Sequence, residues 1–537
     1  MFMRFNRRKN KKEDIANDKD SIINDNDNVI NDNIKDYNKI PVEKSLHSNV
    51  KTVKKALEYS PDLVIRTIKL ENVKSEIVVM YLDGLADSRN IEKNVIQPIL
   101  KKFYKKKPDE KNYDGNVIEK PISIEELKNS ILSVSELKET ATVNECIAGI
   151  LAGDTVLFID NVNKALVINS PGWPTRMPEE PTTEASVIGP RDGFVETLRD
   201  NIVMVRRRIK DHNLSIIKLK LGRRTSTDVA IAYIKGIANR DIVKEVVSRV
   251  EKIDVDEIIE AGTIMQFIED NFLSPLPQMQ YTERPDRVVA ALIEGRIAIL
   301  VDNTPFVLIA PASLPMFLQT PEDYYERWIY TSLIRFLRYL VIMIALFLPG
   351  IYVALISYHQ GLIPTKLAIF IAATREGVPV PSLIEAILME VTLEILREAG
   401  IRLPKTVGQA VGIVGGLVVG EAAVRAGLVS AVYVVIVALT GIASFSMAQY
   451  PFGIPLRILR FVIILAAGVL GLYGVMLSFI ILTVHLVKLK SFGVNYLSPY
   501  IPYRPADWKD FLFRAPVMGM KKRPEMLKTE DKNRQSN

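Results

Sequence analysis

With 537 residues the chain is long enough for several domains, and 69 Lys and Arg against 62 Asp and Glu leave only a modest positive excess. No basic face with interleaved aromatic residues is visible, so composition does not favour nucleic-acid binding. The single cysteine, Cys146, excludes an intrachain disulfide framework and a thiolate metal cluster built from this chain alone.

Residues 1–50 are rich in Asn, Asp, Lys and Ile. They offer little clustered apolar surface to offset the entropy of ordering, so we expect a disordered leader. The charged first residues are not followed by an apolar core segment, which argues against a cleavable signal peptide. We therefore expect the N-terminal half to stay in the cytoplasm.

A globular α/β pattern begins near residue 51. Period-2 apolar runs predict strands over 62–70 and 76–83, and a helix follows over 91–104. The stretch 154–168 predicts a β-hairpin that turns at Asp160 and Asn161.

Two motifs of this region recur farther along the chain in the same order. Tyr81–Asp87 (YLDGLAD) matches Tyr233–Asn239 (YIKGIAN), and Gly153–Asn161 (GDTVLFIDN) matches Gly295–Asn303 (GRIAILVDN). Such repetition predicts a duplicated α/β region made of two related subdomains. It favours a scaffold or binding module over a single catalytic cleft.

The domain boundaries follow from composition. We expect the first α/β subdomain over 51–185 and the second over 186–320, joined by a Pro-rich segment at 170–184. Residues 321–490 form a strongly apolar block that predicts an all-α, polytopic membrane domain, and 491–537 form a basic C-terminal tail.

A membrane crossing needs about 20 apolar residues. Four stretches of the block qualify: Ile329–Tyr358, which carries Arg335 and Arg338 near its start, Val407–Val424, Leu428–Met447 and Ile458–Val487. Lys and Arg prefer the cytoplasmic side, so both flanking hydrophilic regions are expected inside, which requires an even number of crossings.

One stretch of the block, 376–404, is acidic. On a helix, Glu390, Glu394 and Glu398 stack along one side. Carboxylates at membrane depth are costly, so this side should face protein, water or a partner rather than lipid. Two interpretations stay open: an amphipathic helix at the membrane surface or in the bundle interior, and the lining of an ion path. The even number of crossings favours a half-inserted element.

Small residues follow the acidic stretch. Gly408, Gly412, Gly416 and Gly420 recur every fourth residue and would leave a flat strip where another helix can approach closely. The strip suits packing within the chain and a contact between subunits equally well. Glu421 and Arg425, at i and i+4, are candidates for an ion pair inside the membrane.

Enzyme signatures are missing from the sequence. The four histidines stand apart, and there is no HExxH, GxSxG or GxxxxGK[ST] motif. We expect no catalytic, cofactor-binding or metal-binding residues, and hence no enzyme.

Several long motifs resemble those of the A subunit of the GerA-type spore germinant receptors, from about residue 55 to 515. The motifs are LGRRTSTDVAIAYIKGIAN, PRDGFVETLRDNIVMVRRRI, EGRIAILVDNTPFVLIAP, REGVPVPSLIEAILMEVTLEILREAGIRLPKTVGQAVGIVGGLVVGEAAV and PFGIPLRILRF. The resemblance implies a receptor complex in the spore inner membrane that responds to small nutrients. Its partners would be a permease-like B subunit and a lipoprotein C subunit, and its A subunits would form a homo-oligomeric, cation-conducting ring.

Two hypotheses about function remain. In the first, the chain is a subunit of a nutrient-gated channel, and Glu390, Glu394 and Glu398 form stacked acidic rings that favour cations. In the second, the chain is a non-conducting scaffold that couples a nutrient-binding subunit to a separate channel. A secondary transporter is disfavoured because the membrane segments show no inverted repeat.

Overall fold

A computed structural model describes residues 40–58, 60–70, 75–104, 124–128, 137–170, 172, 180–181, 183–184, 186–403, 418–445 and 448–535. Most of the predicted leader, residues 1–39, lies outside the described residues. The chain divides into two compact units. The first comprises Met1–Leu57 and Leu63–Pro171, and the second comprises Glu58–Asp62 and Gly172–Asn537.

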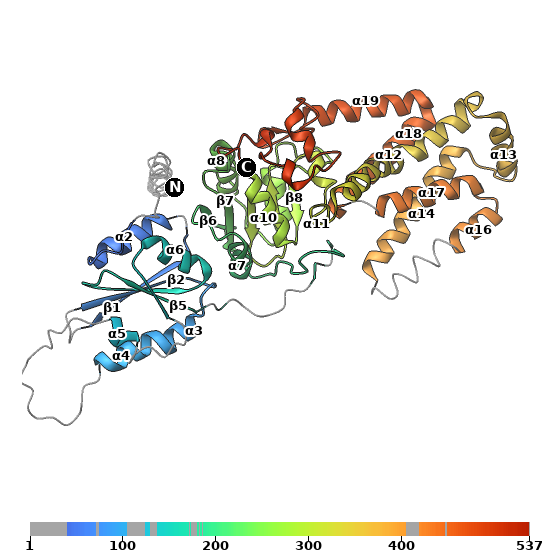
Figure 1. The fold of residues 1–537 in the computed structure, drawn as a ribbon. Helices are drawn as coiled ribbons and strands as arrows, with labels where there is room; N and C mark the ends of the chain where they lie inside the picture. Colours follow the sequence, from blue (N-terminus) through green and yellow to red (C-terminus); the bar gives the residue numbers. More distant parts are fainter. Residues whose placement is uncertain are drawn as a thin grey trace, which may run out of the picture. The chain divides into compact units, whose positions relative to one another are not determined.

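The first unit holds an antiparallel sheet in the order β1-β2-β4-β5-β3 (Figure 1). Its strands are β1 (Leu63–Leu70), β2 (Ser75–Leu82), β3 (Leu137–Thr140), β4 (Thr155–Ile159) and β5 (Ala165–Ile168). Its helices are α2 (Leu46–Ala56), α3 (Ser88–Ile91), a π-helical turn (Glu92–Ile96), α4 (Gln97–Tyr104), α5 (Ile124–Glu126) and α6 (Val143–Ala152). The predicted strands near 62–70 and 76–83, the helix near 91–104 and the hairpin at Asp160–Asn161 are confirmed.

The predicted leader is wrong at its C-terminal end. Helix α2 begins at Leu46, inside the stretch that we expected to be disordered. Leu46 and Val53 are buried. The buried side chain of Asn49 accepts from the amide of Glu43 at 2.8 Å and donates to its carbonyl at 2.6 Å. Apolar residues on one helical face therefore order this segment despite its polar composition.

The second unit begins with a sheet of the same strand order, β6-β7-β9-β10-β8. Its strands are β6 (Leu214–Leu221), β7 (Thr227–Ile234), β8 (Gln280–Thr282), β9 (Ile297–Val301) and β10 (Val307–Ala310), and its helices are α7 (Leu198–Arg208), α8 (Arg240–Glu251), α9 (Ala261–Ile268) and α10 (Pro285–Glu294). Alternate residues of β7 point to opposite faces: Ala230 packs with α7 and α10, and Ile231 packs with α8 and α9.

Equivalent turns in the two sheets have equivalent backbone conformations. Gly153 and Gly295 both end a helix with φ of 96°, a left-handed conformation that glycine adopts without a Cβ penalty. Asn161 and Asn303 both turn a hairpin with positive φ, 64° and 66°. Asn201 of α7 also repeats the two hydrogen bonds of Asn49, to the amide and carbonyl of Val195.

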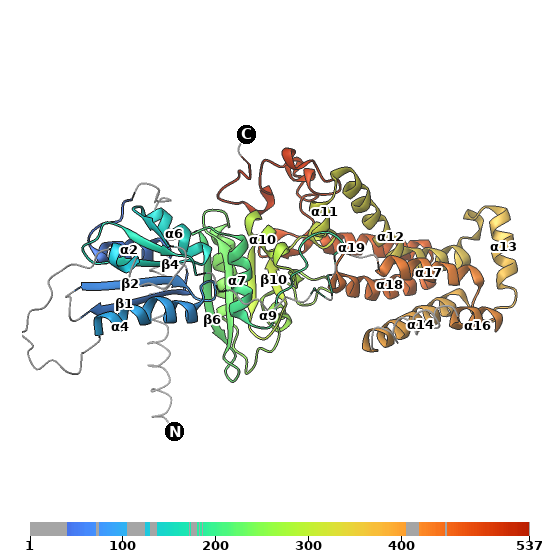
Figure 2. The same cartoon turned by 60° about the horizontal axis from the view of Figure 1, so that its bottom comes forward.

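The rest of the second unit is a helical bundle followed by the tail (Figure 2). The helices are α11 (Glu322–Tyr325), α12 (Trp328–Tyr358), α13 (Thr365–Arg375), α14 (Ser382–Arg402), α16 (Gly420–Arg425), α17 (Ala431–Phe445), α18 (Tyr450–Leu470) and α19 (Leu472–Lys488), and β11 (Lys490–Ser491) and β12 (Val494–Asn495) form a short hairpin after them. Among the described residues, two helices, Trp328–Tyr358 and Pro451–Leu470, are long and apolar enough to cross a membrane by length and composition.

One of the expected crossings differs in the structure. Ile458–Val487, which we expected to be one long span, is broken at Gly471 into the antiparallel helices α18 and α19. Gly471 has φ of 61°, and a Cβ there would lie 2.8 Å from the ring of His359, so only glycine suits this turn. Most of Val407–Val424 lies outside the described residues.

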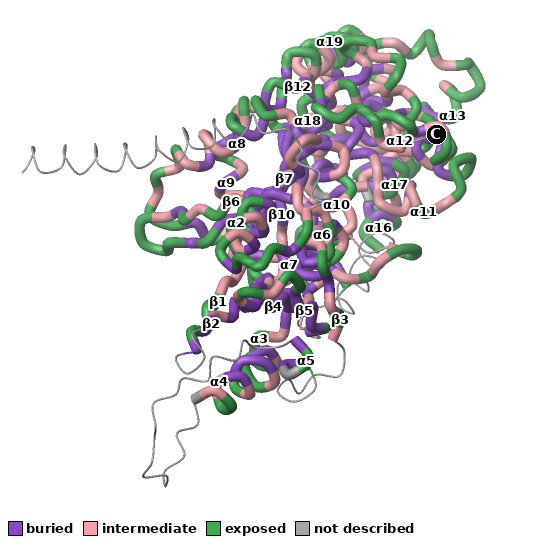
Figure 3. Tube along the Cα trace, turned by 60° about the vertical axis from the view of Figure 1, so that its left-hand side comes forward, coloured by how far each residue is buried: buried purple, intermediate pink, exposed green. Residues whose placement is uncertain are grey.

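Much of the bundle surface is apolar. Figure 3 shows the strands of the sheets largely buried, whereas α19 has long exposed stretches. Large apolar side chains are more than 45% exposed on α12, α17, α18 and α19, for example Leu340, Ile442, Val469 and Ile480. Exposed large apolar side chains in this number mark contact with a membrane or another protein rather than with water.

The C-terminal tail folds back onto the second sheet's subdomain. Ser491 donates to the carbonyl of Gln278 at 2.6 Å, and Leu314 donates to the carbonyl of Tyr496 at 2.8 Å. Phe317 stacks on Phe452 of α18 at 5.3 Å between centroids and contacts Tyr496 at 6.0 Å. The subdomain, the base of the bundle and the tail therefore share one core.

Candidate functional site

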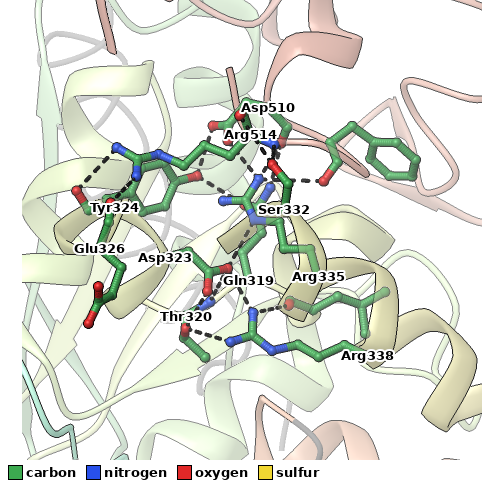
Figure 4. A network of polar contacts seen from close by, with 12 residues as sticks. Gln319, Thr320, Asp323, Tyr324, Glu326, Ser332, Arg335, Arg338, Asp510 and Arg514 are labelled. Carbon is green, nitrogen blue, oxygen red and sulfur yellow. Dashed lines mark hydrogen bonds and ion pairs between the residues drawn. The ribbon is translucent and has the colours of Figure 1, made fainter. Parts of the chain in front are cut away.

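A buried polar network joins the base of α12 to α11 and the tail, and we call it the joint (Figure 4). At its centre, Asp323 of α11 accepts hydrogen bonds from Arg335 Nε at 3.0 Å and from Arg338 Nη1 at 2.7 Å. Both arginines belong to the first turns of α12, three residues apart, so they leave the helix on one side. Thr320 also donates to Asp323 through its hydroxyl at 2.9 Å.

The tail supplies the second carboxylate of the joint. Asp510 accepts from Arg335 Nη1 at 2.8 Å and from the hydroxyl of Tyr324 at 2.8 Å. The side chain of Gln319 donates to the carbonyl of Asp510 at 2.7 Å. Arg335, only 1% exposed, therefore connects α12 with both α11 and the tail.

A third arginine completes the joint from the tail side. Arg514 donates to the carbonyls of Glu326, at 2.7 Å, and Tyr324, at 3.2 Å. Its backbone amide donates to the hydroxyl of Ser332 on α12 at 3.1 Å. The guanidinium carbons of Arg335 and Arg514 lie 5.3 and 5.6 Å from the ring centre of Tyr324, within cation–π distance.

The joint controls the ionisation of its acidic groups. Burial alone would raise the pKa of Asp323, but the hydrogen bonds and charges of Arg338 and Arg335 together outweigh it and lower that pKa. Burial, followed by the charge of Asp510, raises the pKa of Tyr324 well above its ordinary value. Asp323 is therefore held as a carboxylate and Tyr324 as a neutral hydrogen-bond donor.

A second group of charges lies inside the bundle. Glu390 of α14 and Arg460 of α18 are each 1% exposed, and Arg460 Nη2 lies 2.8 Å from Glu390 Oε2. Arg460 also donates to the hydroxyl of Ser444 on α17 at 3.4 Å. An isolated buried carboxylate is costly, and the arginine of the neighbouring helix offsets that cost.

The three glutamates of the predicted stripe differ in their surroundings. Glu394 is half-buried and pairs with Arg397 at 3.0 Å and with Arg457 of α18 at 3.1 Å. Glu398 is exposed and pairs with Arg402 at 2.6 Å. The stripe thus runs from a buried pair at Glu390 to an exposed pair at Glu398, and each carboxylate has an arginine of the same chain as partner.

Sequence reasoning missed a further buried carboxylate, Glu385. It pairs with Arg375 of α13 and accepts from the backbone amide of Ser430 at 2.6 Å. The hydroxyls of Ser430 and Tyr352 lie 3.2 Å apart, which ties α12 to the start of α17. The signal was present, because Glu385 belongs to the acidic stretch. Its distant partners are not visible in the sequence.

The remaining predicted residues lie at the edge of the bundle. Glu421 and Arg425 are 2.6 Å apart, with their side chains 55% and 79% exposed. Gly420 is buried, and a Cβ there would lie 3.6 Å from Val434 of α17, an ordinary packing distance within the chain. Gly408, Gly412 and Gly416 lie outside the described residues.

The described part of the chain offers no metal centre, because no group of three or more His, Cys, Asp and Glu side chains in it is placed to hold an ion. The two charged clusters bind protein groups to one another. Chemically, they can hold helices in a fixed arrangement and release them when the charges change.

Comparison with known proteins places these features in a family. The sequence model of the Bacillus/Clostridium GerA spore germination protein family matches residues 51–526. Spore germination protein KA of Bacillus subtilis strain 168 is 44% identical over 495 residues, covering 92% of this chain and 89% of that protein. The uncharacterized membrane protein YfkQ of the same organism is 43% identical over 491 residues, covering 91% and 93%.

A solved structure is also similar. It is the N-terminal domain of the A subunit of the Bacillus megaterium spore germinant receptor GerK3, at 33% identity and a TM-score of 0.39, covering 51% of this chain and 96% of that one.

Proposed function

Because this chain belongs to the Bacillus/Clostridium GerA spore germination protein family, we propose that it is the membrane subunit of a nutrient receptor that triggers spore germination. The two sheets, with their shared strand order and matching turns, support an origin by duplication. They form the soluble module. A permease-like B subunit and a lipoprotein C subunit are its partners.

The bundle lies in the spore inner membrane as a multi-pass domain. Its exposed apolar side chains support this location, and so do the two helices long enough to cross. The tail packs on the second sheet's subdomain, so the chain enters and leaves the membrane on one side and crosses an even number of times. Lys521 and Lys522 in the tail favour the cytoplasmic, core-facing side.

The observation that carries a coupling role is the joint. Arg335 donates to carboxylates of both α11 and the tail, so a movement of the soluble module reaches α12 through buried, charge-assisted bonds rather than through a loop. A nutrient signal that favours a second arrangement by a few kcal/mol is enough to change its population strongly.

The output of this coupling is a cation current. Copies of the chain form an oligomer, and α14 faces its axis. Glu398 and the half-buried Glu394 then offer carboxylates to passing cations. Glu390 sits behind them and is released from Arg460 as α14 moves. The glycines from Gly408 to Gly420 let neighbouring helices pack closely.

A specific observation also favours a non-conducting scaffold. Each glutamate of the stripe has an arginine partner within this chain, so the stripe has little net negative charge to select cations. In this alternative the bundle holds the nutrient-binding subunit and passes its state to a separate channel.

Ion flux from liposomes that contain the complete receptor separates the two functions. If α14 lines the path, the double variant Glu390→Gln/Glu394→Gln changes the cation-over-anion selectivity of the nutrient-induced current, whereas Glu376→Gln, an exposed site outside the stripe, does not. Unchanged selectivity in the double variant removes these residues from the path. A strictly monomeric chain after cross-linking in membranes eliminates the channel and leaves the scaffold.

A further inference from the structure

A rigid turn after α9 presents apolar side chains to the outside of the second subdomain. Phe272 and Leu273 are each 78% exposed, and Phe267, at the end of α9, is 56% exposed. Exposed aromatic and aliphatic side chains at adjacent positions are uncommon on a soluble surface and mark an interaction site.

The turn is held in this shape from inside. The buried side chain of Gln278 accepts from the amide of Asn271 at 2.9 Å and donates to its carbonyl at 2.6 Å. The side chain of Asn271 in turn accepts from the amide of Leu273 at 3.1 Å. Phe272 and Leu273 are thus fixed outward by the hydrogen bonds of their neighbours, so they do not collapse onto the subdomain.

The turn lies beside the last turns of α19. Ser274 is hydrogen-bonded to His485 of α19, with 2.9 Å between Oγ and Nε2. The residues that flank His485 along the helix, Val484 and Val487, are 47% and 37% exposed. The apolar surface of the helix therefore continues to the level at which the turn begins.

Charges at the same level suit a lipid headgroup layer. Lys488 and Lys490, both exposed, follow directly after the apolar part of α19. The nearby carboxylates of Glu245 and Asp270 are engaged by Arg249 at 2.7 and 2.6 Å, which leaves Asp241 as the remaining carboxylate beside the two lysines. Basic side chains next to exposed aromatic and aliphatic ones are typical of a segment that lies in the membrane interface.

We propose that the turn 270–274 is a membrane anchor of the second subdomain. Phe272 and Leu273 enter the boundary between headgroups and acyl chains of the bilayer that α19 crosses, and Lys488 and Lys490 face anionic headgroups. The 17 residues of α19 rise about 26 Å, close to the thickness of the hydrocarbon core, which places its last turn at this boundary. The proposal rests on the membrane location given under the proposed function.

Depth-dependent fluorescence quenching tests the anchor in the full-length chain in proteoliposomes. Cys146→Ser removes the native cysteine, and single cysteines at Phe272 or Leu273 carry an environment-sensitive label. Nitroxide groups at the lipid headgroup or along the acyl chain act as quenchers. Ile480 lies on the exposed apolar surface of α19 and serves as the positive control, since its side chain is 53% exposed.

Ile259 is the matched negative control. It is 64% exposed on the same subdomain. The carbonyl of the preceding residue, Ile258, accepts a hydrogen bond from Thr227, which lies at the opposite end of the sheet from Gln278 and Ser491. We expect labels at 272 and 273 to be quenched at least half as strongly as the label at 480, most strongly by the headgroup or shallow nitroxide, and the label at 259 to keep its full emission.

Three outcomes would each overturn either the anchor or the membrane location on which it rests. If 480 is quenched and 272 and 273 behave like 259, the anchor is wrong and the membrane location stands. If 480 also escapes quenching, the membrane location itself fails. If 272 and 273 are shielded from both lipid nitroxides and aqueous iodide, another protein surface covers the turn, and the lipid assignment is wrong.

Discussion

Arg335 sits in the first turns of α12 and donates to Asp323 and Asp510, which lie 12 and 175 residues away in the chain. A buried arginine that loses one of two carboxylates keeps its charge without full compensation. Removal of one partner from a buried ion pair typically costs about 3–5 kcal/mol. Neutralising a single carboxylate of the joint should therefore destabilise the protein strongly.

Asp323→Asn tests this expectation. The substitution keeps the shape of the side chain but leaves Arg335 and Arg338 without their shared carboxylate, so we expect a loss of about 3 kcal/mol, the lower end for a buried pair. Chemical denaturation of the purified protein, followed by tail-specific hydrogen exchange, measures it. Glu326 joins the network through its backbone carbonyl, so Glu326→Gln should leave the stability near that of the wild type. Equal effects of the two variants would refute the role of Asp323.

The pH dependence of the joint follows from the lowered pKa of Asp323. A depressed pKa in the folded state means that the stabilising contribution is fully present above the ordinary aspartate value of about 4 and is lost as pH falls through the folded-state value. We expect the tail to loosen in this acidic window. Fluorescence of Trp508, with Trp173 and Trp328 replaced by Phe, reports it. In the Asp323→Asn background, this transition should disappear.

At the scale of elements, the bundle is organised by ion pairs between helices. Glu390 and Arg460 join α14 to α18, while Glu385 and Arg375 join α14 to α13. Buried pairs are weak evidence for stability, since apolar residues of the same volume can stabilise as well. What they supply is a specific register, and a contact that a movement of α14 can break.

A double-mutant cycle measures the Glu390–Arg460 pair. Glu390→Gln and Arg460→Met should each destabilise the protein by about 3–5 kcal/mol, because each leaves a buried charge without its partner. The double variant should lose less than the sum of the two single losses, by a coupling energy of about 0.5–3 kcal/mol. Thermal unfolding in detergent gives the three values. Glu398→Gln, an exposed pair, should cost about 1 kcal/mol or less. Additive effects in the cycle would show that the pair is not coupled.

At the scale of the whole molecule, the tail follows α19 and packs back against the start of the helical bundle. It bonds to the second subdomain at Gly236 and Ile237 as well as at Gln278. In the membrane arrangement that we propose, this return places the subdomain and the tail on one side of the membrane.

Single-cysteine labelling tests this arrangement in sealed vesicles. Cysteines at Ile259 and Lys522 should react with an impermeant maleimide from the same side, and a cysteine at Gly361, between α12 and α13, from the opposite side. The native Cys146 should interfere little, because burial raises the pKa of its thiol to about 12 and leaves almost no thiolate. Labelling of Lys522 and Ile259 from opposite sides would contradict an even number of crossings.

Several features could be predicted because they depend on neighbours in the sequence. The strands β1 and β2, the hairpin at Asn161 and the recurring glycines follow from local periodicity and turn chemistry. The start of α2 was missed because composition outweighed its short apolar face. Asn49 carried a usable signal, since it is as far from Asn201 in the sequence as Gly84 is from Gly236.

The sequence alone predicted the mixed α/β class of the first part of the chain and the helices of its C-terminal half, because apolar periodicity and turn residues act over a few positions. It also supplied the motifs that resemble the GerA family. Only the tertiary structure decided which charges meet. Arg335 with Asp510, and Glu390 with Arg460, are brought together by the packing of distant segments, and no local pattern specifies that packing. The break at Gly471 belongs here too, since the ring of His359 excludes a side chain at that turn.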